Sequence, residues 1–162
     1  MLQPLVTNLL DSPLHDWVNA TVWLWPLMEI LHFFGLSLLL GSLFIIDTRM
    51  AGHIRALSLA AVHRLLPLAF IGFGLNLVTG LLFFCGDPER YAINIGFRIK
   101  MLLVVVAGIN AVVYYWKIHP VMSRWDADAI PPFLAKAVAY TSLVAWAGVL
   151  VLGRLIPYVG TG

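Results

Sequence analysis

Four stretches of the chain are almost continuously apolar, and polar or helix-breaking residues separate them. A helix needs roughly 20 apolar residues to cross ~30 Å of hydrocarbon, and each stretch is close to that length. The pattern predicts membrane-spanning helices over residues 21–46, 65–85, 99–116 and 133–153. Because the connections are short, it also predicts an all-α, up-down four-helix bundle that forms one transmembrane domain over residues 1–162.

Composition supports an integral membrane protein. Of the 162 residues, 61% are hydrophobic and 11% are charged, whereas about a quarter of an average soluble domain is charged. The net charge of +2 gives no basis for nucleic-acid binding, and the single Cys85 excludes an internal disulfide framework. The first stretch does not read as a cleavable signal peptide, because it contains Glu29 and no basic residue precedes it.

Basic residues near the ends of the stretches predict the orientation, because the cytoplasmic side of a membrane protein holds the excess of Lys and Arg. One side has Arg49, Arg55, Arg64, Lys117, Arg124 and Lys136, and the other has Arg90, Arg98, Lys100 and Arg154. This excess favours an orientation with both termini outside the cytoplasm.

Aromatic and amphipathic residues are expected at the two membrane interfaces. Residues 5–19 are expected to lie along the outer interface, with His15 solvated there. Trp23 and Trp25 on the outer side, with Trp116 and Trp125 on the inner side, are typical of interfacial aromatic belts.

Three histidines lie inside or at the edges of the apolar stretches, and an ionisable residue within a membrane is a functional-site candidate by default. They are His32, His63 and His119, and on a helical wheel they share their faces with Gly35, Gly74 and Gly108 respectively. A flat iron macrocycle needs an imidazole to bind its iron and a strip of helix without side chains to lie against. A helix face with a histidine and a glycine offers both. The same glycines also fit close helix packing with nothing bound between the helices.

Glu29 precedes His32 by three positions, so the two side chains are expected to meet on one helix face. A carboxylate there could fix the imidazole tautomer or share a metal. Together with Met28 or Met101, the pair would offer a site suited to copper. The other predicted spans contain no Asp or Glu, so a carboxylate-bridged di-metal centre is not expected.

Asp47 and Arg49 come where the first helix is expected to leave the membrane. We expect them to pair with each other or with lipid headgroups, and Arg64 is a further partner for Asp47. His53, in the following loop, is expected to be solvated.

Several short motifs run through the chain: Trp25-Pro26-x-x-Glu29-x-x-His32-x-x-Gly35, Asp47-x-Arg49-x-x-Gly52, Arg64-x-x-Pro67, Thr79-Gly80-x-x-x-Phe84, Phe97-x-x-Lys100 and Gly108-x-Asn110-Ala111. With them the chain resembles an uncharacterised family of small four-helix bacterial membrane proteins, which is distantly similar to the membrane domain of copper-resistance protein D. The resemblance implies the four-helix fold and gives weight to Glu29 and His32. Relatives tend to place a histidine one turn beyond the Asn-Ala pair, where this chain has Tyr114-Tyr115, so His119 becomes a candidate second ligand.

The first functional hypothesis is electron transfer through a b-type haem, with electrons exchanged with quinone or a partner redox protein. The chain has no Cys-x-x-Cys-His for covalent attachment, so histidines on facing helices would hold the iron. His63 and His119 could clamp one haem near the cytoplasm, whereas His32 would need Met101 or a second imidazole. The haem propionates would seek cations, which are Arg64 and Lys117 inward or Arg98, Lys100 and Arg154 outward.

Two other hypotheses stay open. One is copper or small-solute handling at Glu29 and His32, with Met101 as the further copper ligand. The other is an accessory subunit that packs against a larger membrane complex, or a homo-oligomer. Hydrolytic catalysis is not expected, because no nucleophile with a nearby base is evident along the chain.

Overall fold

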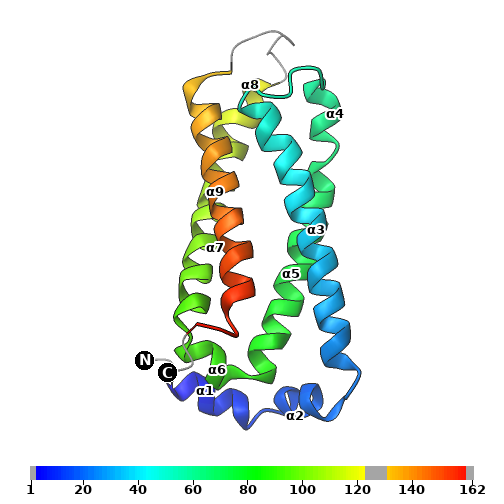
Figure 1. Cartoon of the computed structure of the whole chain (residues 1–162), viewed down its shortest axis with the longest axis vertical. Coiled ribbons are helices and arrows are strands. Elements are labelled where there is room, and N and C mark those ends of the chain that lie inside the picture. The colour runs from blue at the N-terminus through cyan, green and yellow to red at the C-terminus, as the bar shows by residue number, and fades with distance from the viewer. Residues whose placement is uncertain (1–2, 123–130, 160–162) are drawn as a thin grey trace.

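The fold is a bundle of four long helices that run alternately up and down (Figure 1). The computed structural model describes residues 3–122 and 131–159. The long helices are α3 (Leu24–Met50), α5 (Leu66–Gly86), α7 (Ile95–Val113) and α9 (Phe133–Leu155). Each one coincides with a predicted apolar stretch, so the predicted all-α four-helix bundle is confirmed. The predictions made for Arg124 and Trp125 lie outside the described residues.

Shorter helices close both ends of the bundle (Figure 1). Helices α1 (Gln3–Leu10), α2 (Pro13–Ala20) and α6 (Pro88–Ile93) lie at the end where α9 finishes, which we call the α2 end. Helix α4 (Leu59–His63), the π-helix η1 (Tyr114–Ile118) and α8 (His119–Met122) lie at the other end, which we call the α8 end. The π-helix continues α7 directly into α8.

Local sequence explains where several of these helices begin. The side chains of Ser12, Ser58, Asp87 and Asn94 each accept a hydrogen bond from the backbone N–H three residues further on. Such caps satisfy amide groups that have no partner within the helix. In α2 and α6 a proline also occupies the first turn, where its missing N–H does no harm.

Helices α3 and α5 pack closely because two glycines face each other at their crossing. A Cβ placed on Gly72 would lie 2.5 Å from the carbonyl oxygen of Gly35. A Cβ on Gly35 would in turn lie 2.9 Å from the carbonyl oxygen of Gly72. Small residues allow this kind of approach between membrane helices. Of the two roles left open for Gly35, the structure therefore supports helix packing rather than an open face for a cofactor.

The four helices are not equally in contact. Helix α3 packs along α5, α7 packs along α9, and α3 also contacts α9, whereas α5 and α7 scarcely touch each other. The face that α9 turns inward is made of small residues, including Ala135, Ala139, Ser142 and Ala145. The bundle is therefore closed on the α3–α9 side and loose on the α5–α7 side.

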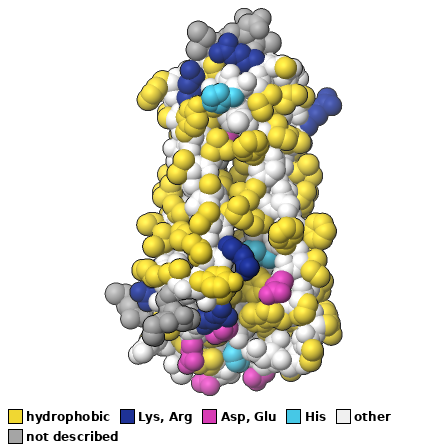
Figure 2. Space-filling view, viewed as in Figure 1, with side chains coloured by type: hydrophobic (Ala, Val, Ile, Leu, Met, Phe, Trp, Pro, Cys, Tyr) yellow, Lys and Arg dark blue, Asp and Glu magenta, His cyan; other side chains and the backbone are white. Residues whose placement is uncertain are grey.

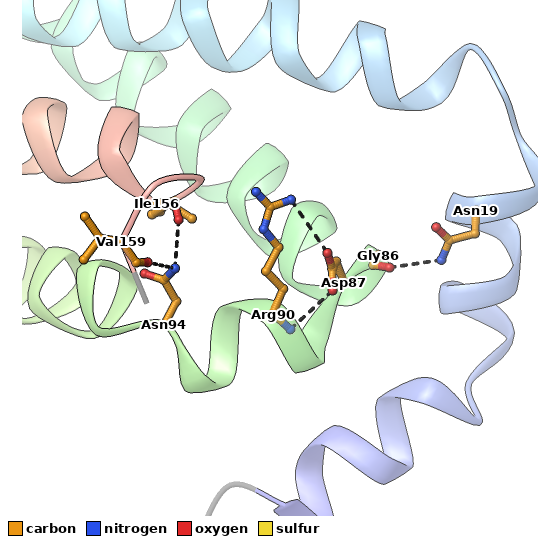
Figure 3. A network of polar contacts seen from close by, with 7 residues as sticks. All are labelled: Asn19, Gly86, Asp87, Arg90, Asn94, Ile156 and Val159. Atoms are coloured by element: carbon orange, nitrogen blue, oxygen red, sulfur yellow. Dashed lines mark hydrogen bonds and ion pairs between the residues drawn. The ribbon is translucent and has the colours of Figure 1, made fainter. Parts of the chain in front are cut away.

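Polar contacts tie the short helices to the α2 end. The Asn19 side chain donates to the carbonyl oxygen of Gly86 at 3.1 Å, and Asn94 donates to those of Ile156 at 2.8 Å and Val159 at 2.5 Å (Figure 3). Figure 3 also shows the ion pair between Arg90 and Asp87, whose charged atoms lie 4.0 Å apart. These contacts satisfy carbonyl groups that have no partner at the ends of α5 and α9.

Two histidines that were expected to be solvated also have protein partners. The Nδ1 atom of His15 lies 2.9 Å from the carbonyl oxygen of Cys85, and Nε2 of His53 lies 2.7 Å from the Tyr140 hydroxyl. His15 thus helps to hold α2 against the end of α5.

The outer surface of the bundle is mostly hydrophobic between two more polar ends (Figure 2). Four helical segments are long and apolar enough to cross a membrane: Leu24–Met50, Ala61–Gly86, Ile95–Val121 and Phe133–Leu155. In a soluble protein this much exposed apolar surface would be a liability. The chain therefore has the architecture of a multi-pass membrane protein, with surfaces suited to contact with lipid.

Candidate functional site

A cavity of about 370 Å³ lies between the four long helices toward the α8 end. Its walls are mainly aliphatic and aromatic, and its polar side chains are few. Phe70 of α5 and Tyr115 of η1 line it and are themselves 68% and 62% exposed, so the cavity opens sideways where α5 and α7 scarcely touch. The polar side chains that line it are Asp47, Asn110, Tyr114, Tyr115, His119 and Ser142.

Asp47 is the most unusual of these residues. Only 3% of it is exposed, and its Oδ2 atom has no hydrogen-bond partner among the described residues. The Ser142 side chain hydrogen-bonds to the same carboxyl group. A buried polar atom without a partner is rare in folded proteins and costs about 1–3 kcal/mol, more when it is charged. Oδ2 of Asp47 can therefore form a hydrogen bond that no described protein atom makes.

The partners that the sequence predicted for Asp47 are not the ones that the structure shows. Among the described residues, no ion pair joins it to Arg49 or Arg64, and Arg49 donates from Nε to the carbonyl oxygen of Leu57 at 2.6 Å. Helix α3 continues to Met50, so Asp47 stays inside the bundle instead of leaving it. The inward position of Asp47 could have been predicted from its spacing in the sequence. Asp47 follows Leu43, which lines the cavity, by four positions, so the two side chains share a helix face.

Asn110 and Tyr114 reach the cavity from the third long helix and its extension. The Asn110 amide donates to the carbonyl oxygen of Val138 at 3.0 Å and so links α7 to α9. Tyr114 begins the π-helix η1, and its hydroxyl lies 3.1 Å from Nε2 of His63. π-helical turns within α-helices are frequent at functional sites, because the wider turn redirects side chains.

His63 and His119 lie together beside this cavity, but they do not face each other across an open slot. Their ring centroids are 5.1 Å apart with an interplanar angle of 57°, and Tyr115 stacks on the His119 ring at 5.4 Å. His63 uses Nε2 toward Tyr114. The two imidazoles as they stand therefore do not fit a haem clamped between them, because the rings contact each other where the macrocycle would lie.

His32 belongs to a different site, in the half of the bundle nearer the α2 end. Its Nδ1 lies 2.7 Å from the Thr79 hydroxyl, which itself donates to the carbonyl oxygen of Leu75 at 2.6 Å. Because the threonine proton is used, His32 must donate from Nδ1, and Nε2 is left as an acceptor. The ring also packs edge-on against Phe83 at 5.6 Å. A histidine held through one nitrogen so that the other can bind is typical of a ligand-binding imidazole.

No described contact joins His32 to Glu29 or Met101, its expected partners. Glu29 is exposed and makes no hydrogen bond to His32 among the described contacts. Burial raises the pKa of the Tyr91 phenol in α6; of the smaller charge effects on it, Arg90 lowers this pKa, and Asp87 and Glu29 raise it. Met101 is 43% exposed on the outer face of α7. No described contact joins Glu29, His32 and Met101, so a copper site formed by these three residues stays a prediction.

The cations and glycines that were predicted for the cofactor site lie in different surroundings. Arg98 donates from Nε and Nη2 to the carbonyl oxygen of Ala92, at 3.1 Å and 2.8 Å, so it closes the turn before α7. Lys100 instead lies over Gly153 of α9. A Cβ on Gly74 or Gly108 would meet nothing within 4 Å, but of these two only Gly108 lines the cavity. Among the described residues, no three His, Cys, Asp or Glu side chains could hold a metal ion together.

The fold and the cavity define a four-helix bundle of the membrane-spanning kind with an internal cavity that opens sideways. Comparison with known proteins adds no family assignment: no family model, no curated protein and no solved structure matches the chain. The resemblance noted from the sequence motifs stays a prediction.

Proposed function

We propose that this protein binds a lipid-soluble ring compound of the quinone class in the Asp47 cavity and takes part in electron transfer within a bacterial inner membrane. The observation that carries the proposal is that Oδ2 of Asp47, at the wall of a mainly apolar cavity, has no hydrogen-bond partner among the described residues. In the orientation favoured by the basic residues, the α8 end faces the cytoplasm and both termini face the periplasm.

The polar groups of the cavity match the edge of a quinone ring. Asp47, Ser142, Asn110 and Tyr114 approach from α3, α9, α7 and η1, while the remaining walls are apolar except for Tyr115 and His119. A carbonyl oxygen of a quinone accepts a hydrogen bond from a protonated carboxyl or a phenol. The hydroxyl of the reduced form donates to a carboxylate. Asp47 could therefore form a hydrogen bond with either redox form, and the ligand would satisfy the oxygen that the described part of the chain leaves unpaired.

The route of entry supports a ligand that arrives from lipid. The cavity opens between α5 and α7, the pair of neighbouring helices with the least contact, and both helices are membrane-spanning segments. Phe70 and Tyr115 stand at this opening and are exposed on the surface that would face lipid. An apolar tail could remain in the bilayer while the ring enters the cavity.

Haem b is a second candidate, and one observation favours it. His119 is the only one of His32, His63 and His119 that lines the described cavity, and Gly108 lines it from the same helical run. His119 would supply the iron ligand, and the second ligand would have to come from a residue that moves, because His63 is bonded to Tyr114. When bound, haem would supply one-electron chemistry.

A matched pair of glycine substitutions tests whether the cavity binds the ligand. Gly108→Leu places a side chain in the cavity, whereas Gly74→Leu places the same side chain in open space outside it. The binding of short-tailed benzoquinone and naphthoquinone analogues to the protein in nanodiscs is measured by quenching of tryptophan fluorescence, since Trp146 lines the cavity. We expect Gly108→Leu to abolish binding and Gly74→Leu to leave it unchanged.

Asp47→Asn tests the polar end of the cavity with almost no change in shape. Loss of a hydrogen bond to a charged group is worth about 1.5–3 kcal/mol, so the dissociation constant should rise about tenfold or more. Equal affinity in wild type, Gly108→Leu and Asp47→Asn would refute quinone binding at this cavity.

An absorption spectrum of the purified protein, expressed with haem available, tests the second candidate, because only haem gives a Soret band that shifts on reduction.

A further inference from the structure

We propose that His63, Tyr114 and His119 bind one divalent transition-metal ion of the zinc type at the α8 end of the bundle. His63 is the last residue of α4, just before α5, whereas Tyr114 and His119 lie in the segment that continues α7. Because α5 and α7 scarcely touch each other, the ion would link two parts of the bundle that are otherwise loosely joined. The proposal does not depend on quinone binding, because it concerns the metal ion alone.

The spacing of the two imidazoles fits ligands of one small ion. Their ring centroids lie 5.1 Å apart at an interplanar angle of 57°. A histidine nitrogen lies about 2.1 Å from a zinc ion, so two histidines on one tetrahedral ion have ring centres about 5 Å apart. Two histidines on a haem iron would instead lie on opposite faces of the macrocycle. The separation of His63 and His119 therefore suits a single ion that both rings contact from neighbouring directions.

Tyr114 has the position of a third ligand. Its hydroxyl lies 3.1 Å from Nε2 of His63, and its ring centroid lies 6.3 Å from each of the two imidazole centroids. Two donor atoms on one tetrahedral zinc ion lie about 3.4 Å apart, and a phenolate ring bound through its oxygen has its centre about 6 Å from the imidazole centres. All three pairs of rings thus have the separations that one shared ion requires. Among the described residues, no third His, Cys, Asp or Glu side chain joins the two histidines, so the tyrosine supplies the oxygen ligand.

The three side chains would exchange one proton for the ion. In the metal-free protein the phenol of Tyr114 is hydrogen-bonded to Nε2 of His63. On binding, this nitrogen, a ring nitrogen of His119 and the phenolate oxygen each donate an electron pair to the ion, and the phenolic proton leaves to water. A water molecule completes the four-coordinate arrangement. No electron is transferred, so binding needs no redox partner.

The position of the cluster allows an ion to arrive from water. His63 is the third residue of one membrane-spanning segment and His119 is the third from the end of another, so both lie near a membrane boundary. His119 is exposed and His63 is partly exposed. Tyr115 stacks on the His119 ring at 5.4 Å and so orients it. The neighbouring Arg64 and Lys117 are exposed, so water and salt screen their repulsion of the cation.

Metal titration of the full-length protein in mild detergent tests the proposal. The protein is purified without a histidine tag and stripped of metal with a chelator. Calorimetry with Zn²⁺ gives the number of ions bound and the dissociation constant. Co²⁺ absorbs visible light strongly when it is four-coordinate, so its spectrum reports the geometry of the site. We expect one ion per chain and a four-coordinate cobalt spectrum.

Three substitutions distinguish this site from binding to any surface histidine. His119→Gln removes an exposed ligand and should raise the dissociation constant at least about tenfold, because even the loss of a group that only orients a ligand costs about that much. Tyr114→Phe keeps the ring and removes only the oxygen, so it should weaken binding by about tenfold and change the cobalt spectrum. His53→Gln is the matched control, because His53 is also exposed at the α8 end and also contacts a tyrosine, Tyr140. It should leave the affinity unchanged.

Hydrogen exchange of wild type, measured by mass spectrometry, adds a test that needs no substitution. Zn²⁺ should slow exchange in residues 59–66 and 114–122 together and leave α2 unchanged. The proposal is overturned if wild type does not bind one Zn²⁺ per chain, or if Tyr114→Phe binds as tightly as wild type. It is also overturned if His53→Gln weakens binding as strongly as His119→Gln, because the ion would then be held by scattered surface histidines.

Discussion

The closest contact between α3 and α5 allows a sharp stability prediction, for the substitution Gly72→Ala. The added methyl group would lie 2.5 Å from the Gly35 carbonyl oxygen and 2.6 Å from the Leu39 amide nitrogen. Carbon contacts are optimal at about 3.5–4.0 Å, so the helices must separate locally by about 1 Å. Both opposing atoms belong to the backbone of α3, and neither can rotate away.

The expected cost follows from overpacking. Inserting a methyl group into a well-packed interior costs about 1–3 kcal/mol. Gly74→Ala is the matched control, because its new methyl group meets nothing within 4 Å. Alanine is the better helix former by about 0.5–1 kcal/mol, so this control should be as stable as wild type or more stable.

Reversible unfolding in mixed detergent micelles, followed by circular dichroism, measures both variants against wild type. We expect the midpoint of Gly72→Ala to fall and that of Gly74→Ala to stay or rise. If Gly72→Ala unfolds at the same detergent fraction as Gly74→Ala, the two helices do not meet at these glycines and the packing argument is refuted.

Three further predictions concern other parts of the chain. Asn94→Ala removes the cap of α7 and the bonds to the last turns of α9, so it should cost about 1–3 kcal/mol and raise amide exchange near Ile156, measured by mass spectrometry. Tyr114→Phe removes the hydroxyl that contacts His63, so it should lower the free energy of unfolding by about 0.5–1.5 kcal/mol; an unchanged value would contradict the contact. The raised pKa of Tyr91 means that the unfolded chain loses its phenolic proton first as the pH rises above the usual value of 10.0. Stability should therefore fall above about pH 10, and a denaturation series against pH should show a shallower fall for Tyr91→Phe.

The sequence predicted some site features because they depend on spacing within one helix. His32 was expected to be functional from its depth in the first apolar stretch, and the structure holds its ring so that Nε2 can bind. Its orienting partner, however, is Thr79 on another helix rather than Glu29, which is only three positions away. Sharing a face allows two side chains to meet, but the contact forms only if no neighbouring helix offers a better partner.

The sequence by itself determined the class of this protein: four apolar segments of membrane-spanning length, joined in alternating directions, within a few residues of their observed ends. Hydrophobic length is a local property of the chain, so it can be read without knowing how the helices meet. Only the tertiary structure decided that Gly35 is a packing contact, that α5 and α7 stand apart, and that a buried oxygen of Asp47 has no partner within residues 3–122 and 131–159. Each of these depends on distances between atoms of different helices, and those distances arise from packing rather than from any pattern along one helix.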